Sequence, residues 1–185
     1  MSNPLLAFFG RIPLFSGLTP DELNELIRAI QPTKLLAGNL LFKEGDPGDA
    51  AYVVESGKLE VFLDRPEGHI KLAELGTNAV LGEITLIDGR KRTAHVRAID
   101  DTSLFRLDKE EFSFLRRNLR PAAYKIISAI SVTVCNRLRE TNELITHTLA
   151  EEIQQPVARE DLAGEADTAI EKQGILQRLA FWRNS

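Results

Sequence analysis

The stretch LGEITLIDGRKRTAHVRA (residues 81–98) places side chains that could bind a small polar ligand close together in the sequence. Glu83 follows a glycine, and Arg92 comes nine positions later with the hydroxyl of Thr93 beside it. Arginine presents fixed N–H donors that suit phosphate oxygens, whereas an ionised carboxylate can only accept hydrogen bonds. Glu83 would therefore repel a phosphate unless the same ligand also offered it a donor.

The residues between these two charges predict an anion site made from the backbone. The EITLID segment that starts at Glu83 lies between two glycines, which leaves room for one or two helical turns. A helix beginning there would direct the free N–H groups of Ile84 and Thr85 toward an anion. Gly82 would let a ligand approach the backbone closely. A nucleotide meets these demands, because its ribose hydroxyl can donate to Glu83 while Arg92 holds its phosphate.

The region before this loop predicts short helices followed by strands. In GLTPDELNELIRAI (17–30), Thr19 is placed to cap a helix, with Pro20 at its first position and Glu22 completing a capping box. Residues 3–15, which are apolar and punctuated by Pro and Gly, predict short helical turns. From Thr33 onward, β-rich runs alternate with turn residues in KLLA, LLFKEGD, AAYVVESGKLEVFLD, HIKLAEL, TAHVRAI and TSLFRL. This spacing predicts an antiparallel sandwich or barrel.

Two turns and one cap are predicted within and after this β region. Ser56-Gly57 separates two strand-like runs and suggests a hairpin, and DRPEGH (64–69) predicts another turn. Asp108 is expected to cap a helix in DKEEFSFLRRNLRP (108–121).

A long helix is predicted from Pro121 to about Ile153, a stretch without internal Gly or Pro. An apolar stripe with an eleven-residue repeat runs along it, as in a nearly straight supercoil. Its members are Ala123, Ile127, Ile130, Val134, Leu138, Thr141, Ile145 and Leu149. Ile126, Ala129 and Val132 lie off the stripe and are expected to pack on the helix's own domain. We expect the stripe to pair with a second copy of the chain; the alternative is that both faces are buried in one monomer.

Composition limits the other classes of function. The 185 residues carry a net charge of −4, which argues against a chain that coats nucleic acid. Cys135 is the single cysteine and suits a reducing compartment; a buried, inert thiol is expected. No apolar run reaches the length of a membrane span, and the N-terminus makes a poor signal peptide, so we expect a cytoplasmic protein. His69, His95 and His147 are scattered without metal-ligand spacing, so neither a metal site nor a catalytic residue is predicted.

The segment GEITLIDGRKRTA resembles the phosphate-binding cassette of the cyclic nucleotide-binding domain, whose pattern is G-E-(L/I)-x-L, a short insert, then R-(S/T/A)-A. The segments LTPDELNELI, LLFKEGDPGDAAYVVESGKLEVF and LAELGTNAVLGE resemble the same family in order and spacing, so that the resemblance covers residues 12–149. It implies an eight-stranded β-roll, a cassette helix and a C-terminal lid helix. By position, it implies that Glu83 holds the ribose 2′-hydroxyl, that Arg92 and Thr93 hold the cyclic phosphate, and that Gly82, Ile84 and Thr85 contribute backbone contacts.

The chain departs from the family pattern at Leu81, Thr85 and Lys91, and has Asn78 where a glycine is common. These changes affect ligand selectivity more than binding, because none removes a charged contact. The segment NRLRETNELI (136–145) resembles the dimer helix of the catabolite activator branch. That resemblance implies that Thr141 and Asn142 contact the purine across the dimer; the alternative is that Thr141 only interrupts a helix seam.

These observations predict an α+β fold, an antiparallel, jelly-roll-like β-roll with N-terminal helices and a long C-terminal dimerisation helix. The expected domains are the nucleotide-binding roll (1–120), the lid and dimer helix (121–153), and an acidic linker with a short amphipathic segment (154–185). We expect a standalone homodimeric sensor of cAMP, with cGMP possible, that is not an enzyme. It would signal to an unidentified protein partner without direct DNA binding, since only some thirty residues follow the helix and they form an acidic stretch without a basic recognition helix. The alternatives are a scaffold that does not bind nucleotide and a transcriptional co-regulator.

Overall fold

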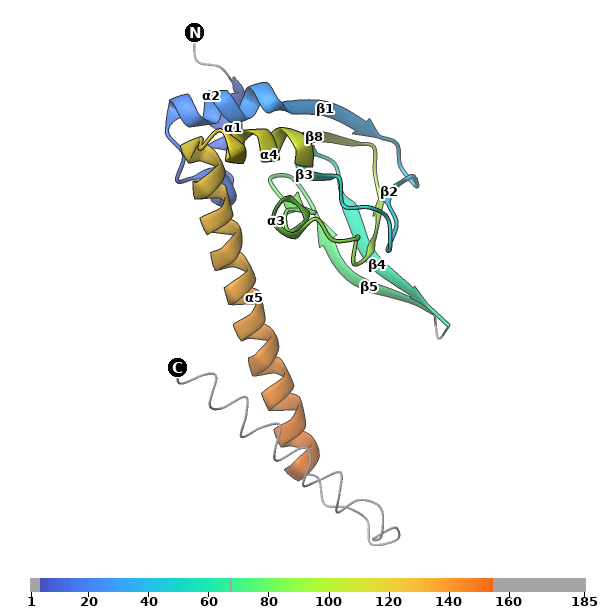
Figure 1. Cartoon of the computed structure of the whole chain (residues 1–185). Helices are drawn as coiled ribbons and strands as arrows, with labels where there is room; N and C mark the ends of the chain where they lie inside the picture. Colours follow the sequence, from blue (N-terminus) through green and yellow to red (C-terminus); the bar gives the residue numbers. More distant parts are fainter. Residues whose placement is uncertain (1–3, 67, 155–185) are drawn as a thin grey trace, which may run out of the picture. The chain divides into compact units, whose positions relative to one another are not determined.

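Eight strands form two four-stranded antiparallel sheets in the computed structural model, which describes residues 4–66 and 68–154 (Figure 1). The strands are β1 (Ile30–Leu35), β2 (Leu40–Phe42), β3 (Ala50–Ser56), β4 (Leu59–Arg65), β5 (Gly68–Leu75), β6 (Val80–Leu81), β7 (His95–Ala98) and β8 (Thr102–Asp108). Their order is β1-β8-β3-β6 in the first sheet and β2-β7-β4-β5 in the second. The predicted antiparallel β-roll is confirmed, and each of the six β-rich runs overlaps a strand, although KLLA covers only the end of β1.

The central strands β3 and β8 of the first sheet are buried on both faces, and β3 shows how its sequence achieves this. Successive side chains of a strand point to opposite faces. Tyr52 and Val54 pack in a core between the two sheets. Ala51 and Val53 pack against the helices, in what we call the helix-side core. The inter-sheet core consists of Ala50, Tyr52, Val54, Leu59, Leu81, Val96, Ala98 and Leu104. An almost uninterrupted apolar run is therefore required in β3, in place of the alternation seen in half-exposed strands.

The N-terminal helices cover the outer face of the first sheet. They are α1 (Pro4–Phe9), the short 3-10 helix η1 (Pro13–Phe15) and α2 (Pro20–Ala29). The predicted capping box is present, since Thr19 Oγ1 accepts from the Glu22 amide at 3.3 Å and Glu22 Oε2 accepts from the Thr19 amide at 2.7 Å. The rings of Phe9 and Phe105 lie 5.2 Å apart and join α1 to β8. These helices thus complete the helix-side core.

The hairpin predicted at Ser56-Gly57 is wrong. β3 belongs to the first sheet and β4 to the second, so this turn carries the chain from one sheet to the other. Gly57 has a φ of +92°, and a Cβ there would lie 2.7 Å from the carbonyl oxygen of Asp101. Strand-like runs around a turn cannot show which sheet each run joins. The other predicted turn does close a hairpin, in which Arg65 of β4 faces Gly68 of β5.

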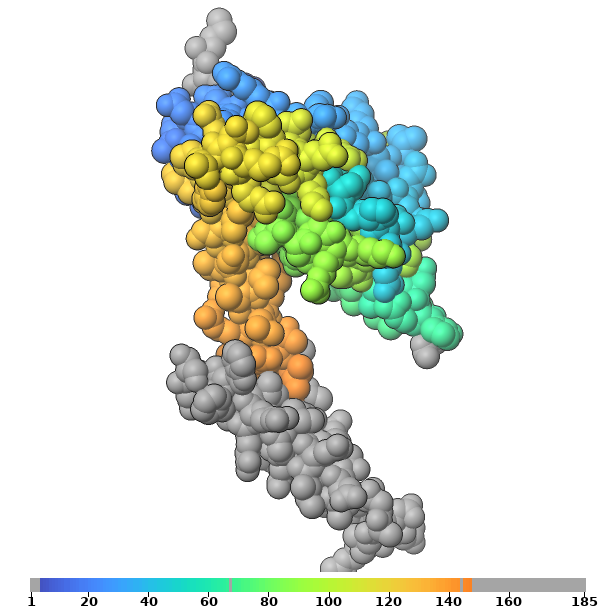
Figure 2. All heavy atoms as spheres, viewed as in Figure 1, coloured from blue at the N-terminus to red at the C-terminus, as the bar shows by residue number. Residues whose placement is uncertain are grey.

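Helix α4 (Lys109–Arg117) follows β8 and begins after Asp108 as predicted, but the predicted side-chain cap is absent. The Asp108 carboxylate instead accepts from Arg106 Nε at 2.8 Å. A charge-assisted bond to a guanidinium is stronger than a bond to a neutral amide, which explains the change of partner. Figure 2 shows α4 and the start of the last helix packed directly against the N-terminal helices.

Helix α5 (Pro121–Gln154) confirms the predicted long helix. Residues up to Ile130 belong to one compact unit, and a second unit starts at Ser131, within α5. Ile126 is fully buried in the helix-side core, as predicted for a residue off the stripe. The rest of the predicted division is wrong, because Ala123 and Ile130 of the stripe are buried in the same core while Val132 is 58% exposed. Periodicity defines an apolar face but not the residue at which contact with the domain ends. Farther along, Val134, Leu138 and Ile145 of the stripe are exposed.

Cys135 is exposed as well, contrary to the expected buried thiol. Within residues 4–66 and 68–154, no helix combines the length and the apolar character that crossing a membrane requires.

Candidate functional site

The loop between β6 and β7 begins with a glycine that brings backbone and arginine together. Gly82 has a φ of +70°, a left-handed conformation that favours glycine. A Cβ at this position would lie 2.4 Å from Arg92 Nη1 and 3.2 Å from the Ala50 carbonyl oxygen. Asn78, which stands where the family often has glycine, also has a φ of +70°. The close approach predicted for Gly82 is therefore made to the arginine side chain itself.

Arg92 is a buried cation whose hydrogen-bonding capacity is only partly used. Its side chain is 2% exposed. Nη2 donates to Asp49 Oδ1 at 2.9 Å and to the Ala50 carbonyl at 2.7 Å. Nε and Nη1 are buried and have no hydrogen-bond partner among the residues that the structure describes. Buried donors without acceptors are costly, so this arrangement favours an anion that can approach these two nitrogens.

Glu83 and the short helix α3 (Thr85–Asp88) follow directly on Gly82. Glu83 is 6% exposed, and its carbonyl accepts from the Leu86 amide at 3.1 Å. Helix α3 begins at Thr85, with Ile84 as its cap residue, two positions later than expected. The amides of Ile84 and Thr85 thus lie at the N-terminal end of the helix, where N–H groups have no acceptor in the preceding turn.

The remaining predicted cassette side chains differ in exposure. Thr85 is buried, and its side chain packs so closely on Gly48 that a Cβ at Gly48 would lie 2.4 Å from Thr85 Oγ1. Ile84 is 42% exposed and Thr93 is exposed. The side chain of Thr85 therefore joins the cassette to the preceding loop, whereas Thr93 remains accessible beside Arg92.

The sequence also allowed a surface loop on which Glu83 and Arg92 form an ordinary salt bridge, and the structure does not have this arrangement. Both residues are buried, and the carboxylate that pairs with Arg92 belongs to Asp49. Burial by itself would raise the pKa of Asp49, but the charges of Arg106 and Arg92 outweigh it and hold that pKa below its usual value. An ionised Asp49 thus keeps one nitrogen of Arg92 fixed.

Sequence reasoning missed the residues that surround Arg92. Asp49 lies in the segment EGDPGD, whose two glycines and proline predict a tight loop and do not by themselves indicate a binding site. Its second oxygen accepts from Arg106 Nη2 at 3.0 Å, and Arg106 Nη1 donates to the Tyr52 hydroxyl at 3.2 Å. The ring of Phe42 lies over the Arg92 guanidinium, with 4.1 Å between the ring centroid and Cζ. The sequence signal that could have pointed to Asp49 is the pair of aspartates on either side of Pro47-Gly48. Nothing in the sequence pattern singled out Phe42.

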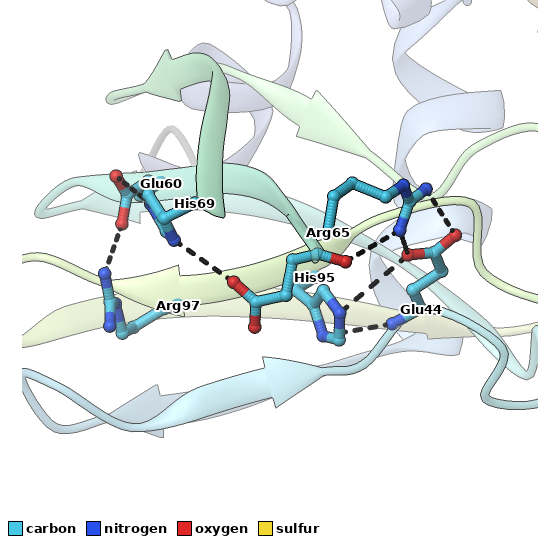
Figure 3. Close-up of polar contacts among 7 residues, drawn as sticks. Glu44, Glu60, Arg65, His69, His95 and Arg97 are labelled. Atoms are coloured by element: carbon cyan, nitrogen blue, oxygen red, sulfur yellow. Dashed lines mark hydrogen bonds and ion pairs between the residues drawn. The ribbon is translucent and has the colours of Figure 1, made fainter. Parts of the chain in front are cut away.

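Two of the histidines that are scattered in the sequence are brought together by the second sheet. The rings of His69 and His95 lie 4.5 and 5.1 Å from that of Phe62. Figure 3 shows the carboxylates around them, with Glu60 holding both His69 and Arg97. The hydrogen bonds from Arg97 and from His69 lower the pKa of Glu60.

His69 lies between two carboxylates, since Nε2 lies 3.2 Å from Glu60 Oε1 and Nδ1 lies 3.3 Å from Asp64 Oδ1. We expect His69→Gln to lower the melting temperature by roughly 1–3 °C, because it removes these two polar contacts of a side chain that is partly exposed. Melting curves of both proteins would show it, and an unchanged melting temperature would contradict it.

Thr141 and Asn142 lie on α5 in the second unit, whereas the cassette belongs to the first. Thr141 Oγ1 donates to the Arg137 carbonyl at 2.8 Å, and the Asn142 carbonyl accepts from Thr146 Oγ1 at 2.7 Å. Hydroxyls in helices commonly bond back to the preceding turn in this way. A contact of Thr141 or Asn142 with a purine stays a prediction.

Known proteins that match this chain share a single domain family. The cyclic nucleotide-binding domain matches residues 32–118. A cAMP-dependent protein kinase regulatory subunit of Emericella nidulans is 38% identical over 109 residues, which are 59% of this chain and 26% of that protein. The cyclic AMP receptor protein of Thermus thermophilus is 33% identical over 147 residues, which are 79% of this chain and 66% of that protein. The chain thus spans only part of the length of these relatives.

Solved structures extend the likeness to three dimensions. A cyclic nucleotide-binding domain from Methylobacillus flagellatus has a TM-score of 0.66 at 27% identity, over 78% of this chain and 82% of that chain. The catabolite activator protein of Thermus thermophilus has a TM-score of 0.64 at 26% identity, over 91% of this chain and 85% of that chain. Sequence, sheet order and these structures agree, and the chain belongs to the cyclic nucleotide-binding domain family.

Proposed function

We propose that this chain is a standalone sensor of a cyclic nucleotide, with cAMP as its first ligand and cGMP as its second. The observation that carries the proposal is Arg92, a buried cation whose Nε and Nη1 have no hydrogen-bond partner among the described residues and whose guanidinium packs against Gly82, the residue before the buried Glu83. The relatives named as a cyclic AMP receptor and as a cAMP-dependent kinase regulatory subunit support the choice of cAMP. Binding and release of the nucleotide would be the whole chemistry, without a catalytic step.

Each cassette residue has a role that suits its chemistry. Arg92 and Thr93 would hold the cyclic phosphate, and Glu83 would accept a hydrogen bond from the ribose 2′-hydroxyl. The backbone of Gly82, Ile84 and Thr85 would complete the anion site. A cyclic phosphate brings one negative charge to a site that already contains two carboxylates, which favours it over a more highly charged linear monophosphate.

Calorimetric titration of the purified chain with cAMP, cGMP and 5′-AMP tests this proposal. We expect a Kd on the order of micromolar for cAMP, a weaker one for cGMP and no measurable binding of 5′-AMP. Equal affinity for cAMP and 5′-AMP would show that the cyclic ester is not recognised. Absence of binding by all three would favour the alternative of a scaffold with this fold.

We also propose that the chain acts as a homodimer in which α5 is shared. Val134, Leu138 and Ile145 are 38%, 57% and 41% exposed, although they lie four and seven residues apart on one apolar stripe of the helix. Thr141 lies on the same stripe, so pairing through it would place Thr141 and Asn142 at the interface, where they could contact the purine. The segment 121–153 would then be the lid and dimer helix.

Leu138→Arg tests the dimer, because it places a charge in the middle of the stripe. We expect sedimentation equilibrium to show a dimer for the wild type and a shift to monomer for the variant, with Kd raised at least about a hundredfold. Asn136→Arg is the matched control, since it adds the same charge to the same helix about 200° away around the axis. If both variants dissociate equally, or neither does, the stripe is not the interface.

The output of the sensor would be contact with a protein partner rather than with DNA. Closure of α5 over the base would change a surface in the segment 154–185, most of which lies outside the described residues. A transcriptional co-regulator is one form that such an output could take. Co-purification with and without cAMP would identify the partner, and capture independent of the nucleotide would argue against a sensor.

A further inference from the structure

Phe42 covers one face of the buried Arg92 guanidinium. The ring centroid lies 4.1 Å from Cζ, closer than the 5.9 Å between Cζ and the Tyr52 ring. Phe42 and Tyr52 are 6.1 Å apart and inclined by 34°. Arginine is attracted to aromatic faces at such distances, and the attraction grows with desolvation. Here the Arg92 side chain is 2% exposed and Phe42 is partly buried.

The contact between the Phe42 ring and the Arg92 guanidinium does not compete with hydrogen bonds of the guanidinium. All N–H bonds of a guanidinium lie in its plane, whereas an aromatic ring above the plane contacts its face. Phe42 can therefore stay in contact while an anion approaches in the plane at Nε and Nη1, which are unpartnered in the described part of the chain. A polar neighbour at the same position would have consumed one of these donors.

Backbone structure fixes Phe42 against Arg92. The register of β2 against β7 shifts between Leu40 and Phe42, an irregularity of the kind that redirects side chains near functional sites. The turn after β2 then binds the arginine backbone in both directions. The Gly45 amide donates to the Arg92 carbonyl at 2.9 Å, and the Arg92 amide donates to the Asp46 carbonyl at 2.9 Å.

We propose that Phe42 is a positioning residue for the nucleotide phosphate. Its ring orients the plane of the Arg92 guanidinium and leaves Nε and Nη1 for the ligand, while Asp49 and the Ala50 carbonyl hold Nη2. This inference rests on the proposed function and assigns a role to a residue outside the cassette. It also accounts for a buried arginine whose carboxylate partner, Asp49, is 56% exposed.

Titration with cAMP of Phe42→Leu and Phe42→Tyr tests the inference. Phe42→Leu removes the π-face and should weaken binding by about 2- to 30-fold, whereas Phe42→Tyr keeps the face and should retain the affinity within about twofold. Phe8→Leu is the matched control, because Phe8 is also partly buried but packs in the helix-side core. It should lower stability without changing the affinity for cAMP.

An NMR measurement on the ligand-free protein supplies a readout independent of nucleotide. Ring currents should shift the Arg92 Nε–H proton upfield in the wild type and in Phe42→Tyr, but not in Phe42→Leu; Arg92→Lys identifies the resonance. The inference is overturned if this shift is the same in all three proteins, or if Phe42→Tyr loses as much affinity as Phe42→Leu. If the wild type binds no cyclic nucleotide, the proposed function fails, and the proton shift alone decides whether Phe42 orients Arg92.

Discussion

Replacing Arg92 by alanine should weaken cAMP binding by about 2–5 kcal/mol, roughly thirty- to several-thousand-fold. The substitution removes a charge-assisted contact with the phosphate that is shielded from water, since the Arg92 side chain is 2% exposed. Two of its nitrogens have no acceptor in the described residues. The free protein already bears the cost of burying these donors, so a phosphate gains the full benefit of pairing with them. Calorimetry on the wild type and the variant measures the difference directly.

Arg90→Ala is the matched control, because Arg90 lies on the same loop with its side chain 87% exposed. Screened by water, it should change the affinity by less than about 1 kcal/mol. Arg92→Lys separates charge from geometry, since an ammonium keeps the charge but not the planar donors; we expect an affinity between those of the wild type and Arg92→Ala. If Arg90→Ala and Arg92→Ala weaken binding equally, the loop attracts anions only through its net charge.

Features that depend on nearby residues could be predicted from the sequence. The capping box of α2 joins residues three apart, so Thr19 and Glu22 fix the helix start regardless of what packs around it. The left-handed backbone at Asn78 and Gly82 is also a local feature, because glycine and asparagine tolerate this conformation better than other residues do. The cassette was found because its ligand-binding groups are likewise close together along the chain.

Features that depend on distant residues could not be predicted. Asp49 and Phe42 meet Arg92 across 43 and 50 positions, through pairings of strands and turns that no periodicity encodes. The sheet change at Ser56-Gly57 was missed for the same reason, because a local turn signal does not identify the strand's partner. His69 and His95 looked unrelated until the second sheet placed both against Phe62.

Phe112→Ala should lower the free energy of unfolding by about 3–5 kcal/mol, the largest stability effect that we expect from a single change in this chain. Phe112 is fully buried where α4 meets the N-terminal helices and the first turns of α5. The truncation loses apolar contacts and leaves a cavity that helices anchored on two sides cannot close. Urea denaturation followed by circular dichroism measures the loss, as a lower midpoint with an unchanged slope.

Phe114→Ala is the control, since Phe114 lies two residues away on the same helix but is 56% exposed, and it should change stability by no more than about 0.5 kcal/mol.

Saturating cAMP then adds a test that links the helix-side core to the nucleotide site. At a hundred times Kd, a ligand that binds only the folded state adds about 2.7 kcal/mol. Because Phe112 belongs to the helix-side core and Arg92 packs among Phe42 and Tyr52, we expect this increment to survive in Phe112→Ala. At the same cAMP concentration it should fall below about 0.9 kcal/mol in Arg92→Ala. Loss of the increment in both variants would mean that the helix-side core and the cassette fold and bind as one unit.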